Sequence, residues 1–162
     1  MKYDKAIEFM IYEYNKTMDY HCDEYMDRIR GVARVLDELG YGLEHRITAL
    51  FRFMMNDTDA TSADLLKYSS MDVLEALKLL QEPRNCEKIK YLYNIKGNML
   101  AFPVKMAEHL YDLRNRKKKK KKEIEALIHE SEDYYLKCAH DTIFYEPMFM
   151  ELVKCKTKVG VY

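Results

Sequence analysis

The chain has 162 residues, of which 48% are hydrophobic and 33% are charged, and this balance excludes an intrinsically disordered chain. It contains only 5 glycines and 3 prolines, so it lacks the turn residues of a fold built from many short strands. Its 27 basic and 27 acidic side chains cancel, which argues against a globally basic nucleic-acid-binding protein.

The first third of the chain shows the spacing of amphipathic helices. Apolar residues recur at positions i, i+3, i+4 and i+7 within Ile7–Tyr14, Val32–Leu39 and Ile47–Met54. Gly40 and Gly42 follow the second of these segments, where the end of a helix favours glycine. We therefore predict three helices in this part of the chain, with a break between the second and the third.

The rest of the chain predicts six more helices separated by short polar turns. Their expected spans are Ala63–Tyr68, Met71–Leu80, Cys86–Lys96, Leu100–Asn115, Lys122–Ala139 and Glu146–Lys154. Thr61 or Ser62 can cap the first of them, and Pro103 is tolerated in a first turn, so that the fourth can begin near Ala101 or Phe102. We predict an all-α helical bundle of about eight or nine helices that forms one domain over residues 1–162.

The four cysteines and the N-terminal segment favour the cytoplasm. Cys22, Cys86, Cys138 and Cys155 form no C-x-x-C pair and stand beside no histidine at zinc-finger spacing, so they are interpreted as reduced thiols. The N-terminal segment carries charges where a signal peptide has its apolar region. No apolar run approaches the ~20 residues that cross a membrane, so no membrane association is expected.

Three stretches, taken together, resemble one known family. They are YMDRIRGVARVLDELG (Tyr25–Gly40), ALFRFMMNDTDAT (Ala49–Thr61) and YLYNIKGNMLAFPVKMAEHLYDLRN (Tyr91–Asn115). In order and separation they resemble the HD-superfamily domain that hydrolyses the bacterial stringent-response alarmones ppGpp and pppGpp. The flanking segments also fit, so the resemblance covers nearly the whole chain and implies an HD-type helical bundle.

The metal ligands of that family are replaced in this sequence. In the family a metal ion, commonly manganese, is held by a histidine, a His-Asp dyad and a later aspartate. Here the first histidine position is Arg28, the dyad is Arg52-Phe53, and the last aspartate is Glu108. An arginine stays protonated and has no acceptor, and a phenylalanine ring offers no ligating atom to a hard cation. We therefore expect neither a metal nor another cofactor.

Other positions of the family's site are retained in part. The acidic pair that assists the nucleophile in the family is Asn56-Asp57 here, so half of it is preserved. Lys105 matches a lysine of the family pattern, and Asp112 stands where the family has an asparagine. The basic loop that helps to bind the alarmone in the family has no counterpart near residues 19–20.

Two arginines stand where the family places its cation. We expect Arg28 and Arg52 to pair with Glu108 and Asp57, because acids left without a metal would otherwise be buried unpaired. The guanidinium groups would then take over the electrostatic role of the metal. The alternative is a pocket that has closed, with Phe53 and Met54 packed inside it.

Three classes of function remain open for such a site. The favoured hypothesis is a non-catalytic binding or regulatory module in which Arg28, Arg52 and Lys105 bind a nucleotide or phosphate, since guanidinium groups suit phosphate. The runner-up is an active metal-dependent phosphohydrolase acting on ppGpp or a similar nucleotide. The third is a protein–protein interaction module. The sequence determines neither the ligand nor the oligomeric state.

Two further features carry weaker signals. His140-Asp141 is the only literal His-Asp string, but it lies far along the chain from the metal positions and is interpreted as a structural pair. His109 neighbours Glu108, but consecutive helical residues diverge by about 100°. The run Lys117–Lys122 is expected to be solvated, with a patch for nucleic acid or an acidic partner as the alternative. No interleaved aromatic residue supports base stacking there, so nucleic acid is the less favoured partner.

Overall fold

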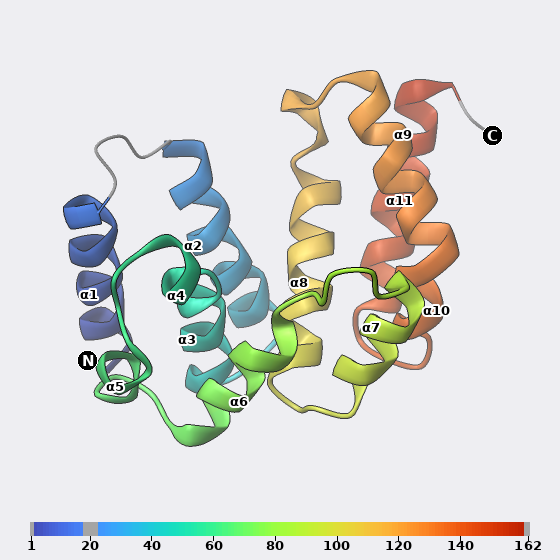
Figure 1. Ribbon diagram of the computed structural model, residues 1–162. Helices are drawn as coiled ribbons and strands as arrows, with labels where there is room; N and C mark the ends of the chain where they lie inside the picture. The colour runs from blue at the N-terminus through green and yellow to red at the C-terminus, as the bar shows by residue number, and fades with distance from the viewer. Residues whose placement is uncertain (1, 18–22, 161–162) are drawn as a thin grey trace.

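The computed structural model describes residues 2–17 and 23–160, and every regular element in these ranges is helical (Figure 1). The α-helices are α1 (Lys2–Thr17), α2 (Asp23–Glu38), α3 (Leu43–Phe51), α4 (Met54–Asp57), α5 (Ser62–Leu66), α6 (Met71–Leu80), α7 (Lys88–Lys96), α8 (Ala101–Arg114), α9 (Lys121–Glu130), α10 (Leu136–Ala139) and α11 (Tyr145–Val159). The all-α prediction is confirmed. Residues 19 and 20 and Cys22, about which the sequence raised expectations, lie outside the described ranges.

Apart from the four-residue helices α4 and α10, nine α-helices lie in the described ranges, in agreement with the predicted eight or nine. The short helix α4 forms separately after α3. The predicted helix over Lys122–Ala139 is continuous along the chain but is divided into α9 and α10 by a π-helical turn, Ser131–Tyr135. A short 3₁₀ helix, Arg116–Lys118, also precedes α9.

Several helix boundaries follow the local chemistry of the sequence. Thr61 caps α5, accepting a hydrogen bond from the backbone of Asp64 while the Asp64 side chain bonds back to the Thr61 backbone. Gly40 follows α2 with a φ of 84°, a left-handed conformation that glycine adopts without strain. The helix α11 runs five residues beyond its predicted end at Lys154, because the left-handed residue that terminates it is Gly160, with a φ of 75°.

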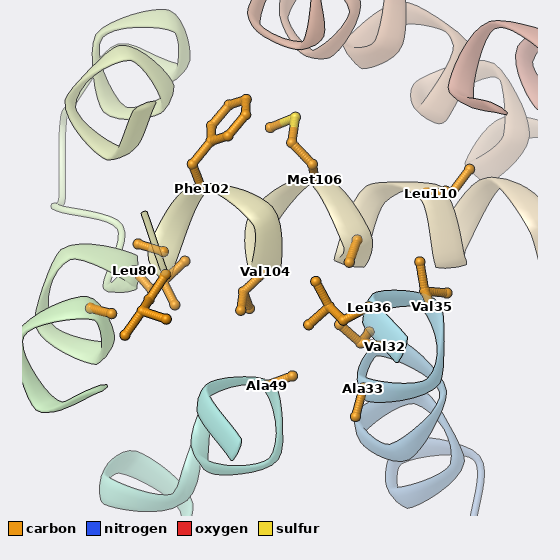
Figure 2. Packing of buried hydrophobic residues seen from close by; sticks show 14 of the residues in the cluster. Val32, Ala33, Val35, Leu36, Ala49, Leu80, Phe102, Val104, Met106 and Leu110 are labelled. Atoms are coloured by element: carbon orange, nitrogen blue, oxygen red, sulfur yellow. The ribbon is translucent and has the colours of Figure 1, made fainter. Parts of the chain in front are cut away.

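The helix α8 lies at the centre of the fold. Ten of its 14 residues are buried, and it contacts α2, α3, α6, α7, α9 and α11. Figure 2 shows Val104 of α8 pointing toward Leu36 of α2 and Ala49 of α3, whereas Met106 points away from them toward the other side of the helix. The buried hydrophobic residues form one cluster around this helix. A helix that other helices cover on several sides is expected to carry apolar residues on more than one side.

The close approach of α2 to α8 depends on a glycine. A Cβ atom added at Gly31 would overlap the ring of Tyr111, which lies on α8. The same two helices are also joined by the ion pair between Arg28 on α2 and Asp112 on α8. Within the described part of the chain, no helix is both long enough and apolar enough to cross a membrane.

Candidate functional site

The side chain of Arg52 lies at the centre of the candidate site. Arg52 is the residue that follows α3, and its side chain is only 7% exposed. Its Nε donates to Glu108 Oε1 at 2.9 Å, and its Nη2 donates to the carbonyl oxygen of Leu80 at 2.7 Å. The guanidinium also lies over the ring of Phe53, 4.5 Å from the ring centre. The pairing of Arg52 with Glu108 that the sequence led us to expect is therefore present in the structure.

Glu108 is a buried carboxylate held by two cations. Its side chain is 5% exposed, and its second oxygen, Oε2, accepts a hydrogen bond from Lys105 Nζ at 3.2 Å. Burial alone would raise the pKa of Glu108, but the charges of Lys105, Arg52 and Arg28 outweigh it and hold the pKa below its ordinary value. Glu108 therefore remains ionised, and both of its oxygens are engaged.

Arg28 pairs with a different acid from the two that we expected. Its Nε and Nη2 donate to the two carboxylate oxygens of Asp112 at 2.9 and 3.0 Å. Burial lowers the pKa of Arg28, but the ion pair with Asp112 more than offsets it, so the pKa is raised overall. Asp112 is one helical turn beyond Glu108 on α8, and this shift corrects the predicted partner.

Asp57 also departs from the prediction, because it binds tyrosines and no arginine. Its Oδ2 accepts hydrogen bonds from the hydroxyl groups of Tyr14, at 2.9 Å, and Tyr25. Burial raises the pKa of both tyrosines, and Asp57 raises both further, so their hydroxyls stay protonated as donors. The three residues join α1, α2 and α4, and Asp57 thus has a structural role at the edge of the site.

An open hollow of about 690 Å³ remains beside these ion pairs. Its lining comprises Arg28, Arg52, Phe53, Asn56, Gln81, Glu82, Arg84, Lys105 and Glu108. Six of the eight positions singled out from the sequence resemblance are thus brought together, whereas Asp57 and Asp112 lie outside the lining.

Phe53 lines the hollow, so the expected alternative of a pocket filled by this ring does not describe the structure. Met54 is instead fully buried in the core.

The turn between α6 and α7 supplies the lining residues that the sequence comparison missed. Gln81, Glu82 and Arg84 belong to a polar turn that we interpreted only as a helix break. The hydroxyl of Tyr91 donates to the same Leu80 carbonyl that Arg52 contacts, and this tie anchors the end of α6 to α7. The charged residues beside Pro83 are visible in the sequence, but they match no motif that would place them in the site.

The donor atoms of this site do not fit a divalent cation. Both oxygens of Glu108 bind cationic side chains, and both oxygens of Asp112 bind Arg28. Arginine has no free electron pair with which to ligate a metal. Among residues 2–17 and 23–160, no group of three histidine, cysteine or acidic side chains is placed to hold an ion. The metal implied by the sequence resemblance therefore has no counterpart in the chemistry of these residues.

The remaining features that the sequence singled out, two histidines and the lysine run, lie away from the hollow. His109 points to a different side of α8 from Glu108, where it stacks on Tyr135 and contacts the hydroxyl of Ser131 at 2.6 Å. His140 and Asp141 form an exposed local contact of 3.1 Å in the turn after α10. The run Lys117–Lys122 forms a 3₁₀ turn and the start of α9. None of these features lines the hollow.

Comparison with known proteins gives a structural match without a sequence match. No protein-family model and no curated protein matches the chain. Among solved structures, it is similar to a metazoan ortholog of SpoT that is described as hydrolysing ppGpp and playing a role in starvation responses. The two share 15% sequence identity and superpose with a TM-score of 0.69, over 99% of this chain and 97% of that chain. This chain therefore has the same fold as that ppGpp-hydrolysing protein.

Proposed function

We propose that the chain is a non-catalytic relative of the ppGpp hydrolases that binds a nucleotide or another phosphate-bearing ligand in the hollow beside Arg52. The observation that carries this proposal is the buried ion pair between Arg52 and Glu108. In the resemblance described above, these residues stand at two of the positions that ligate the metal. A guanidinium supplies positive charge at this point but neither a ligand for a metal nor a metal-bound hydroxide.

The charge of the hollow supports binding of an anion. Its lining contains four cationic residues, namely Arg28, Arg52, Arg84 and Lys105, and two acidic ones, Glu82 and Glu108. Glu82 is additionally neutralised by Lys88, at 3.6 Å. Positive charge is therefore in excess, and guanidinium groups present the planar donors that phosphate oxygens accept.

Arg84 is the cation most available to an incoming ligand. It is exposed on the turn between α6 and α7, and it forms no ion pair with any residue in the described ranges. Arg28, Arg52 and Lys105 are already paired with acids. We infer that Arg84 makes the first contact with a phosphate group, while the paired residues form the electropositive floor of the hollow.

The first experiment combines metal analysis with an assay of manganese-dependent ppGpp hydrolysis on one preparation of the purified protein. We expect no bound transition metal and no turnover. Stoichiometric metal together with turnover would instead support the alternative that the chain is an active phosphohydrolase, and would refute the proposal.

The second experiment measures binding of ppGpp and of inorganic pyrophosphate by calorimetry. Arg84→Gln should weaken binding about tenfold, as loss of one charge-assisted contact of about 1.4 kcal/mol implies. Arg30→Gln is the matched control, since it removes the same charge from an exposed position of α2 outside the hollow. Absence of binding by both anions, or an equal effect of the two substitutions, would contradict a phosphate site here.

A further inference from the structure

The outward side of α11 carries apolar side chains that remain largely exposed in the fold. Of the eleven large hydrophobic residues exposed in the described ranges, five lie in or just before this helix: Ile143, Tyr145, Phe149, Met150 and Val153. The opposite side of α11 buries Met148, Leu152 and Cys155 in the core. The helix is therefore apolar on two sides, and only one of them is accounted for by folding.

The exposed apolar residues form a continuous ridge. Tyr145, Phe149 and Val153 follow one another at intervals of four residues, so they lie along one line on the helix surface. The rings of Tyr145 and Phe149 are stacked, with centres 6.2 Å apart and planes 11° apart. Phe149 is 47% exposed, although burying an aromatic ring of this kind yields roughly 1.5–3 kcal/mol. Such a ridge favours packing against another helix.

A neighbouring row of residues indicates which helix would fit. Glu146, Met150, Lys154 and Lys158 also follow at intervals of four, with the acid at the start of the row and the lysines at its end. A copy of the same row running in the opposite direction places Glu146 beside Lys154 of the copy, and Met150 beside Met150. A partner helix that carries only acidic or only basic side chains would meet a like charge at one end of this row.

Two further properties of α11 favour binding of this row to the same row of a second copy. Lys154 contacts Glu151 at 2.9 Å within the helix, but its side chain is 53% exposed and can reach a second carboxylate. Antiparallel helices also oppose their dipoles, which adds a small favourable contribution. In Figure 1, α11 lies at the edge of the molecule remote from α1, and it contributes no residue to the hollow beside Arg52.

We propose that the chain forms a symmetric homodimer through antiparallel packing of α11 against α11 of a second copy. The two-fold axis passes near Met150. The interface therefore contains the ridge of Tyr145, Phe149 and Val153 twice, and the Glu146–Lys154 contact twice. A two-fold dimer needs only one self-complementary patch on the subunit, and this helix provides one. The hollows of both subunits remain open in the dimer.

The test measures the mass in solution by sedimentation equilibrium over a range of concentrations. The wild type should approach twice the subunit mass of 19.4 kDa. Phe149→Glu should give the single subunit mass, because it places a charge in the apolar ridge. Met99→Glu is the matched control, since Met99 is 86% exposed on a surface outside α11, and it should remain dimeric. Circular dichroism confirms that each variant retains its helices.

A charge exchange separates this arrangement from unspecific association. Glu146→Lys should weaken the dimer by about tenfold, because it creates a like-charge contact at both ends of the interface. The double variant Glu146→Lys/Lys154→Glu should restore the wild-type association. In addition, Met150→Cys should form a disulfide between subunits on oxidation, whereas Met99→Cys should not.

Three results would overturn the proposal. The first is a wild type that stays at 19.4 kDa up to about 100 μM, because a weak dimer with a Kd near 10 μM would be mostly assembled at that concentration. The second is a dimer that survives Phe149→Glu. The third is a double charge exchange that fails to restore association.

Discussion

Replacing Arg52 with methionine removes the guanidinium from the centre of the candidate site while keeping a side chain of similar length. Glu108, whose side chain is 5% exposed, then loses the donor at 2.9 Å and keeps only Lys105, at 3.2 Å. The Leu80 carbonyl keeps the hydroxyl of Tyr91 as a donor. The main consequence of Arg52→Met is therefore a buried Glu108 carboxylate that has lost one of its two paired cations.

The expected loss of stability follows from this geometry. Removing one partner of a buried ion pair costs about 3–5 kcal/mol, because the other charge stays buried. Since Lys105 remains in place beside Glu108, we expect the lower end of this range, about 3 kcal/mol, for Arg52→Met. Glu108→Gln should also be destabilising, because it leaves the Arg52 guanidinium buried beside a neutral amide.

A double-mutant cycle measured by urea denaturation tests this reasoning. The variants are Arg52→Met, Glu108→Gln and the two together, and the double variant should be more stable than the sum of the single losses by about 1–3 kcal/mol. A loss below about 1 kcal/mol for Arg52→Met, or strict additivity, would show that the pair does not hold the site together.

The same ion pair predicts the direction in which the stability of the fold changes at acid pH. Because the pKa of Glu108 is lower in the folded state than in the unfolded chain, its contribution is fully present above the unfolded pKa of about 4.3. It is lost as the pH falls through the lower, folded pKa, since the unfolded state takes up the proton first. The loss should be smaller in Glu108→Gln, which has no carboxyl to protonate. An unchanged acid transition in this variant would refute the assignment of the charge to Glu108.

Three further changes test other parts of the fold. Burial, with the nearby cations Lys105, Lys88 and Arg28, lowers the pKa of His109 to about 3, so the unfolded chain binds a proton below pH 6.5 that the folded state excludes. Stability measured by urea denaturation should fall by about 2 kcal/mol from pH 7 to pH 5, and His109→Gln should abolish most of that slope. Gly31→Ala should cost about 1–3 kcal/mol in thermal unfolding, because its methyl group overlaps the ring on α8. Thr61→Ala should cost about 1 kcal/mol by the same measurement, because it removes the cap of α5.

The fold was predictable to the extent that helices follow hydrophobic periodicity. The helix over Met71–Leu80 has the bounds that its sequence predicts, because its apolar stripe coincides with a serine cap, Ser70, whose side chain accepts from the Val73 backbone. The π-helical turn over Ser131–Tyr135 was not predictable in this way. It is associated with long-range contacts, since His109 on α8 stacks on Tyr135 and contacts Ser131.

The site was predictable in its members and less so in its pairs. The resemblance located Arg28, Arg52 and Glu108 near one another, and the structure brings all three to one hollow. The choice of Asp112 as the partner of Arg28 depends on how α2 crosses α8, because one helical turn separates Asp112 from Glu108. Such a shift of about 5.4 Å leaves no trace in the periodicity of either helix.

The retention of charge in this hollow bears on the proposed function. A buried ion pair generally adds no stability over apolar residues of the same size, so stability alone gives no reason to keep Arg52, Glu108 and Lys105 together. If these charges served stability alone, Arg52→Leu/Glu108→Leu/Lys105→Leu, which leaves none of them buried without its partner, would fold at least as well and would lose nothing else. If the hollow binds phosphate, this variant should fold but lose affinity for ppGpp and pyrophosphate, because two of the three cations of the electropositive floor are gone. Unfolding and calorimetry on this one variant therefore distinguish an ion pair kept for binding from one with no role beyond packing.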